Sequence, residues 1–330
     1  MRTLIAVIAE IVVLLLPVAV LAQAPAAQLS ADDAVRTREF YRLAAQIQDN
    51  IWPHWSQTPA PLLLVTTSTE YLTHHPAPPK DFTKIGDDLY ARPRQFPPGL
   101  LATFPAFGPP SVIVIGEPAN TSSKTSTHWL ITLMHEHFHQ LQNAQPRYIQ
   151  GVEELGLSHG DNTGMWMLNY PFPYEKQDLA QSFARLRDLL LDALSEPDGG
   201  KFAKLAEQYI GERKKFLGQL APDDHKYLSF QLWQEGIARY TEIKAAEAAA
   251  KFQPSAEYAA LPDFESFGAY ASRARSETLD ELRQSDLAKL KRMVVYSFGA
   301  AEGFLLDRVN PNWKDEYFKR SFSTDALFEK

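Results

Sequence analysis

The sequence predicts an α+β fold, in which a small mixed or antiparallel sheet precedes a mostly helical C-terminal part. Short apolar or β-branched runs separated by proline pairs fill the region 55–118, and this pattern is typical of strands joined by turns. After Asn120, long stretches with helical spacing of apolar residues follow. The chain is therefore expected to divide into residues 1–24, 25–120 and 121–330.

The composition is that of a globular protein that contains no cysteine. The chain has 330 residues, of which 45% are hydrophobic and 22% charged, enough for one large or two ordinary domains. A net charge of -7 without a basic run makes nucleic acid and anionic membrane surfaces poor candidate partners. The lack of cysteine excludes disulfides, iron–sulfur clusters and thiolate metal sites.

Residues 1–24 have the organisation of a secretory signal peptide. A short positive start precedes an apolar stretch over 4–22, which Glu10 interrupts, and Ala22-Gln23-Ala24 supplies small residues at a cleavage spacing. We therefore expect cleavage after Ala24, a secreted or periplasmic protein, and no stable membrane insertion after cleavage. The alternative is an uncleaved N-terminal anchor.

The first expected element is a helix over 31–51, with Phe40 and Leu43 on its apolar side and Trp52-Pro53 at its end. Three strands are then expected in the proline-rich region. They are placed at 62–67, 100–104 and 111–115, and the later helices at 125–142, 177–195, 200–219, 224–252, 264–292 and 296–308, with a loop over 145–175.

The run from His135 to His139 matches the pattern H-E-x-x-H. Residues four apart share one face of a helix, so His135 and His139 can present two imidazole nitrogens to one zinc ion. Glu136, one position further round, can act as general base on a metal-bound water. His137 points about 200° away from His135 and is not expected to join the site.

A catalytic zinc ion needs a third protein ligand beside the two histidines, and several residues are candidates. One zincin class supplies a histidine six residues after the motif, but Gln145 occupies that position and excludes the class. Glu235 is the preferred ligand, because it shares a helical face with apolar residues and Gly236 beside it indicates close backbone approach. The alternatives are an ordinary ion pair of Glu235 with Arg239, or ligation from the loop by Glu153, Glu154, His159 or Asp161.

The H-E-x-x-H motif together with the distant Glu235-Gly236-x-Ala238-x-Tyr240 resembles the gluzincin metallopeptidases, in particular the peptidase MA-like group. The resemblance covers about residues 110–310. It implies a zincin-like, thermolysin-like core, in which a sheet edge beside the motif helix binds the substrate as an added strand. Residues 111–116 are expected to form that edge.

The same resemblance implies a tyrosine or histidine that stabilises the oxyanion. Tyr296 is preferred, with Tyr240 and His159 as alternatives. The aromatic segment 165–174 is expected either to line a substrate cleft as a lid or to be a buried connector.

These features predict a secreted zinc metallopeptidase acting on peptide or protein substrates, with Glu136 as base and Tyr296 as oxyanion donor. The alternatives are a protein that binds zinc without turnover, and a zinc amidase acting on cell-wall or other non-peptide substrates.

Overall fold

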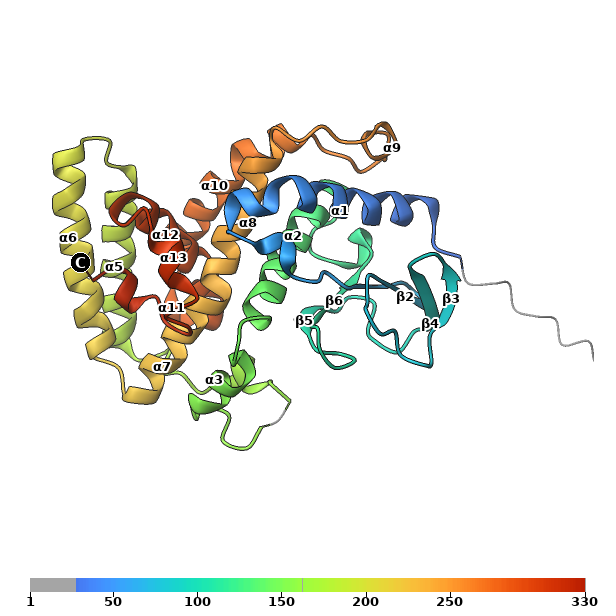
Figure 1. Cartoon of the computed structure of the whole chain (residues 1–330). Coiled ribbons are helices and arrows are strands. Elements are labelled where there is room, and N and C mark those ends of the chain that lie inside the picture. The colour runs from blue at the N-terminus through green and yellow to red at the C-terminus, as the bar shows by residue number, and fades with distance from the viewer. Residues whose placement is uncertain (1–27, 162, 330) are drawn as a thin grey trace, which may run out of the picture.

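The computed structural model describes residues 28–161 and 163–329, and it confirms the α+β class. A six-stranded sheet is followed by a mostly helical part, and the two lie side by side in Figure 1. The predicted signal peptide lies outside the described residues. Within the described part of the chain, no helix combines the length and the apolar character needed to cross a membrane.

The sheet is mixed and has the strand order β3-β4-β2-β1-β6-β5. β1 runs parallel to β6, and all other neighbouring strands are antiparallel. The strands predicted at 62–67, 100–104 and 111–115 are present, whereas β2, β3 and β4 were not predicted. Their bounds are β1 (Leu62–Val65), β2 (Thr69–Thr73), β3 (Thr83–Gly86), β4 (Leu89–Pro93), β5 (Leu101–Phe104) and β6 (Val112–Gly116).

The segment predicted as the sheet edge is an inner strand. β6 lies between β1 and β5, and all five of its residues are buried. A run that is apolar at every position is typical of a strand covered on both faces, which is the physical reason for this correction. The edge beside the motif helix is β5, whose four residues are half-buried.

The two faces of the sheet contact different parts of the chain. Ile113 and Ile115 belong to the main core, which also contains the apolar residues of the helices. Val112 and Val114 point to the other face and pack in a smaller cluster with loop aromatics such as Phe82. This alternation places β5 and β6 directly against the helix that carries the H-E-x-x-H motif.

The long helices lie close to their predicted positions, but two of them are interrupted. The predicted helix over 224–252 contains a π-helical turn at Leu232–Gly236, and that over 264–292 stops at Gln284. The helices are α1 (Ala31–Ile51), α2 (Ser126–Asn143), α3 (Tyr148–Glu154), α4 (Trp166–Asn169), α5 (Gln177–Ser195), α6 (Gly199–Gly218), α7 (Pro222–Gln231), α8 (Ile237–Ala249), α9 (Ala256–Ala259), α10 (Phe267–Gln284), α11 (Leu287–Leu290), α12 (Val294–Val309) and α13 (Trp313–Tyr317).

Candidate metal centre

Helix α2 holds the H-E-x-x-H motif in the interior of the protein. The side chain of Thr125 accepts a hydrogen bond from the His128 backbone N–H and caps the helix. Met134 and Phe138, four positions apart on the same face of the helix, are fully buried. His135, Glu136 and His139 are also buried, so their polar atoms need partners inside the protein.

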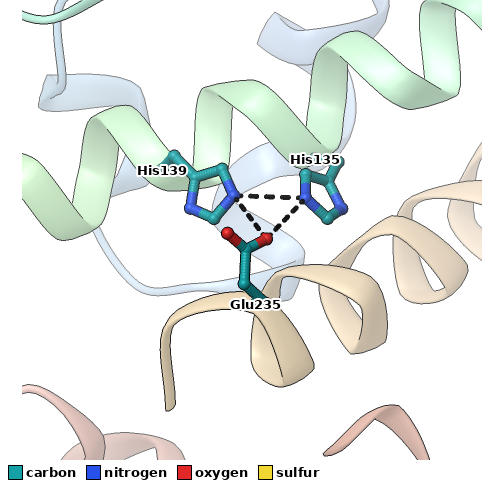
Figure 2. A group of neighbouring side chains, drawn as sticks. All are labelled: His135, His139 and Glu235. Carbon is teal, nitrogen blue, oxygen red and sulfur yellow. Dashed lines mark hydrogen bonds and ion pairs between the residues drawn. The ribbon is translucent and has the colours of Figure 1, made fainter. Parts of the chain in front are cut away.

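Glu235 faces both histidines of the motif (Figure 2). The Nε2 atoms of His135 and His139 are 3.2 Å apart. Glu235 Oε2 lies 3.8 Å from His135 Nε2 and 3.5 Å from His139 Nε2. One ligand atom from each of the three residues therefore converges on a small volume, and the group could hold a metal ion.

The position of Glu235 depends on the π-helical turn and on a close helix contact. Glu235 lies within the turn at Leu232–Gly236, and such turns are frequent at functional sites. A Cβ atom added to Gly236 would lie 2.7 Å from the Cα of Gly299 on α12. The predicted close backbone approach at Gly236 is thus confirmed, and it brings α12 against the site.

The outer nitrogens of both histidines have fixed partners. Nδ1 of His135 lies 3.1 Å from Glu242 Oε2, and Nδ1 of His139 lies 2.7 Å from Gln142 Oε1. The amide of Gln142 is oriented by its Nε2, which donates to the Trp233 carbonyl oxygen. When each Nδ1 carries the proton, each Nε2 has a free lone pair, which is the tautomer that binds a metal.

The charges in this cluster shift its pKa values strongly. Burial lowers the pKa of His135, but the carboxylates of Glu235 and Glu242 outweigh this effect and raise it to about 10. Burial also acts to raise the pKa of Glu235, yet the two histidines hold it well below its usual value. In the metal-free protein, these pKa shifts favour an ionised Glu235 carboxylate beside a protonated His135. A divalent metal would take the place of that proton, because two neutral imidazoles and one carboxylate form a donor set that suits it.

Glu136 lies against the edge strand of the sheet. The hydroxyl of Thr103 on β5 donates a hydrogen bond to Glu136 Oε2 over 2.7 Å. Burial and nearer groups have the largest effects on the pKa values of His135 and Tyr296. The charge of Glu136 has a smaller effect and raises both values. The carboxylate of Glu136 thus lies within electrostatic reach of the metal-site residues.

Tyr296 lies near the two histidines, and Arg292 is hydrogen-bonded to it. The ring centroids of Tyr296 and His135 are 6.3 Å apart. Arg292 donates to the Tyr296 hydroxyl over 3.2 Å, and its guanidinium lies 3.7 Å from Glu235 Oε1. Burial, followed by the charge of Glu235, raises the pKa of Tyr296, so its hydroxyl stays protonated and available as a donor.

The two other candidate oxyanion donors have different environments. The hydroxyl of Tyr240 donates to Asp307 over 2.8 Å, and the ring of Tyr240 packs against Gly303. His159 is exposed on the loop after α3. Neither residue shows the contact with the metal-site histidines that Tyr296 makes.

The alternative third ligands are either exposed or bonded to other residues. Glu153 is exposed, and Glu154 pairs with Arg147 at 2.9 Å. Asp161 accepts hydrogen bonds from Thr163 and from the Trp166 backbone N–H. Within the described residues, His135, His139 and Glu235 form the one histidine–carboxylate group close enough to hold a metal.

The predicted ion pair of Glu235 with Arg239 is not formed. Arg239 instead pairs with Glu242 at 2.7 Å and with Glu281 at 3.3 Å. Because Glu242 also contacts His135, Arg239 supports the site through Glu242.

His137 lies on the opposite side of α2, as expected. It is buried and stacks on Trp55 with ring centroids 5.0 Å apart. Burial lowers the pKa of His137 to about 4, so its ring is neutral. It therefore belongs to the core packing between α1, α2 and the turn that contains Trp55.

The aromatic segment 165–174 combines two buried aromatic residues with half-buried and exposed positions. Trp166 and Phe172 are buried, and Trp166 stacks on Phe230 at 5.5 Å between ring centroids. Met165 and Leu168 remain about half exposed, each at 48%. The segment reaches the site indirectly, since Gln231 donates to the Met167 carbonyl oxygen and accepts from Arg292.

Four residues that contact the site were not found from the sequence. Gln142 and Glu242 could have been identified from helical spacing. Gln142 follows His139 by three positions and Glu242 follows Glu235 by seven, and both lie on a buried helix face. Thr103 and Arg292 carry no such periodic signal, since only the folded chain brings them to the site.

No family model matches this chain, and no curated protein or solved structure matches it either.

Proposed function

We propose that the protein is a secreted zinc metallopeptidase that hydrolyses peptide bonds in a zincin-like site. The observation that carries the proposal is the convergence of His135, His139 and Glu235 beside Glu136. The gluzincin-like motifs in the sequence support the same reaction, and the N-terminal sequence supports secretion.

The spacing of the three ligand atoms fits zinc. Two ligands at zinc distances in a tetrahedral site are about 3.3–3.4 Å apart, from bond lengths of roughly 2.0–2.1 Å. The observed separations between His135 Nε2, His139 Nε2 and Glu235 Oε2 are 3.2, 3.5 and 3.8 Å. Three protein ligands also leave the open fourth position that a catalytic site requires.

The roles of the chain's residues follow from their placement. When bound, zinc supplies a Lewis acid that acidifies water and polarises a carbonyl group. Glu136 accepts the proton of the attacking water and later delivers it to the leaving amine. The protonated hydroxyl of Tyr296, held by Arg292, donates to the oxygen on which negative charge develops.

The test compares the mature protein with its Glu136→Gln variant on a quenched fluorescent peptide library. We expect the variant to keep one zinc per chain while its kcat falls by about 10²–10⁴-fold, the usual contribution of a general base. Metal content is measured by elemental analysis after dialysis. Glu207→Gln, an exposed glutamate on α6, is the matched control and is expected to leave both quantities unchanged.

The same comparison, extended to cell-wall and other non-peptide amide substrates, separates the alternatives. Zinc-loaded wild type that cleaves no peptide contradicts the proposal. Turnover of cell-wall or other non-peptide amides instead of peptides would identify a zinc amidase. Tight zinc binding without turnover of either substrate class would identify a non-catalytic zinc-binding protein.

A further inference from the structure

We propose that Thr103, on the edge strand β5, is a positioning residue that orients the general base Glu136. The inference rests on the proposed function, because it assigns Thr103 a part in the same reaction. It adds a residue from the sheet to a site whose other members all come from helices or helical turns.

The hydrogen bond from Thr103 leaves one oxygen of Glu136 available for chemistry. Thr103 Oγ1 lies 2.7 Å from Glu136 Oε2 and 3.2 Å from the Glu136 backbone oxygen. A hydroxyl has one proton, and a carboxylate is the stronger acceptor, so the proton is donated to Oε2. Among the described residues, no group donates to Oε1, which remains to accept a proton from water.

The strand geometry explains why this contact is made by Thr103. Side chains alternate along β5, so Leu101 and Thr103 face α2, whereas Phe104 packs with the cluster on the opposite face of the sheet. A β-branched threonine in a strand has a restricted χ1 angle. The hydroxyl is therefore held in place before substrate binds.

The position of Thr103 also connects the base to the open edge of the sheet. β5 pairs with β6 on one side and has no strand partner on its other side within residues 28–161 and 163–329. Such an edge can bind an extended peptide by main-chain hydrogen bonds. A substrate bound there would lie beside Thr103. The strand β5 would then both bind the substrate and orient Glu136.

Kinetics of two substitutions test the role of the hydroxyl. In Thr103→Val, which keeps the shape but removes the donor, we expect kcat to fall about tenfold, with KM and zinc content near wild type. Thr103→Ser keeps the donor and is expected to retain most of the activity. Thr83→Val, on the opposite edge strand β3, is the matched control and should behave as wild type.

A crystal structure of each metal-free protein provides a readout that does not depend on activity. We expect one Glu136 rotamer in wild type and in Thr103→Ser, and a displaced or multiple conformation in Thr103→Val. An unchanged Glu136 in Thr103→Val, or equal losses of kcat in the Val and Ser variants, would overturn the inference. Failure of the proposed function is distinguishable, because it would appear as an inactive wild type or an active Glu136→Gln variant.

Discussion

Two buried clusters of charged side chains lie against helix α12. They differ in how their hydrogen-bond donors and acceptors are paired. In the Glu302 cluster, formed by Glu302, Arg213, Tyr209 and Asp325, Glu302 is fully buried and accepts from Tyr209 and Arg213, each at 2.5 Å. Arg213 also donates to Asp325 over 2.8 Å. Every charge in this cluster has an opposite partner, as a structural ion-pair network requires.

The metal-site cluster, formed by His135, His139 and Glu235, differs because its ligand atoms converge on one small volume. With each Nδ1 proton directed to Glu242 or Gln142, the two Nε2 atoms and Glu235 Oε2 offer three lone pairs to one point, which is a donor set that suits a divalent metal. Buried charge is common to the two clusters and does not by itself indicate function. The difference lies in whether donors and acceptors pair with one another, as in the Glu302 cluster, or whether acceptor atoms converge on one point, as in the metal-site cluster.

The largest expected effect is loss of the metal in Glu235→Ala. An outer partner of a metal ligand contributes 10–100-fold in affinity, so removal of a ligand is expected to weaken zinc binding by about a thousandfold or more. Peptide hydrolysis should be lost, and the zinc-induced rise of the unfolding temperature should disappear. Thermal unfolding with and without zinc measures this, and wild-type zinc affinity in the variant would remove Glu235 from the ligand set.

The next largest effect is expected in the Glu302 cluster. Arg213→Met leaves the buried Glu302 carboxylate without its cation and should lower the free energy of unfolding by about 3–5 kcal/mol. Arg213→Met combined with Glu302→Leu should recover most of that loss, since no charge is left unpaired. Urea denaturation measures both. Arg185→Met, at an exposed site on α5, is the control and should change the free energy of unfolding little. A change in Arg213→Met as small as that of the control would contradict the prediction.

The smallest effect concerns Asp325, at the partly exposed end of the Glu302 cluster. Burial acts to raise the pKa of Asp325, but Arg213 and His225 hold it below its usual value. Ionised Asp325 therefore stabilises the fold above the unfolded-state pKa of about 3.9, and this contribution is lost as the pH falls through the lower folded-state pKa.

Asp325→Asn should consequently cost about 1 kcal/mol at pH 7, and the difference from wild type should shrink below about pH 4. Urea denaturation at pH 7, 5 and 3.5 follows the difference. Asp192→Asn, at an exposed position, is the matched control. A difference that is independent of pH would show that the charge of Asp325 is not the source of the stabilisation.

Periodic patterns in the sequence were sufficient to locate most helices and the metal-site residues. The helices at 31–51 and 177–195 were predicted at their observed bounds, and Glu235 was identified because a carboxylate on an apolar helix face needs a partner. The zinc chemistry and the oxyanion role of Tyr296 remain predictions, although the structure brings Tyr296 close to His135.

The features that were missed depend on irregular backbone or on contacts distant in the sequence. The turn at Leu232–Gly236 departs from the 3.6-residue period on which helix prediction relies. β3 and β4 are short and partly exposed, so their residues give little apolar signal. The order of β5 and β6 in the sheet is set by tertiary pairing, although the wholly apolar sequence of β6 already favoured an inner strand.

The contact between Gly236 and Gly299 sets how closely the turn that carries Glu235 approaches α12, at a point where neither residue has a side chain. Glu235 and Tyr296 each lie within three positions of one of these glycines, so two backbones in direct contact set the separation of their main chains. A side chain at either glycine would therefore push the two main chains apart and increase that separation.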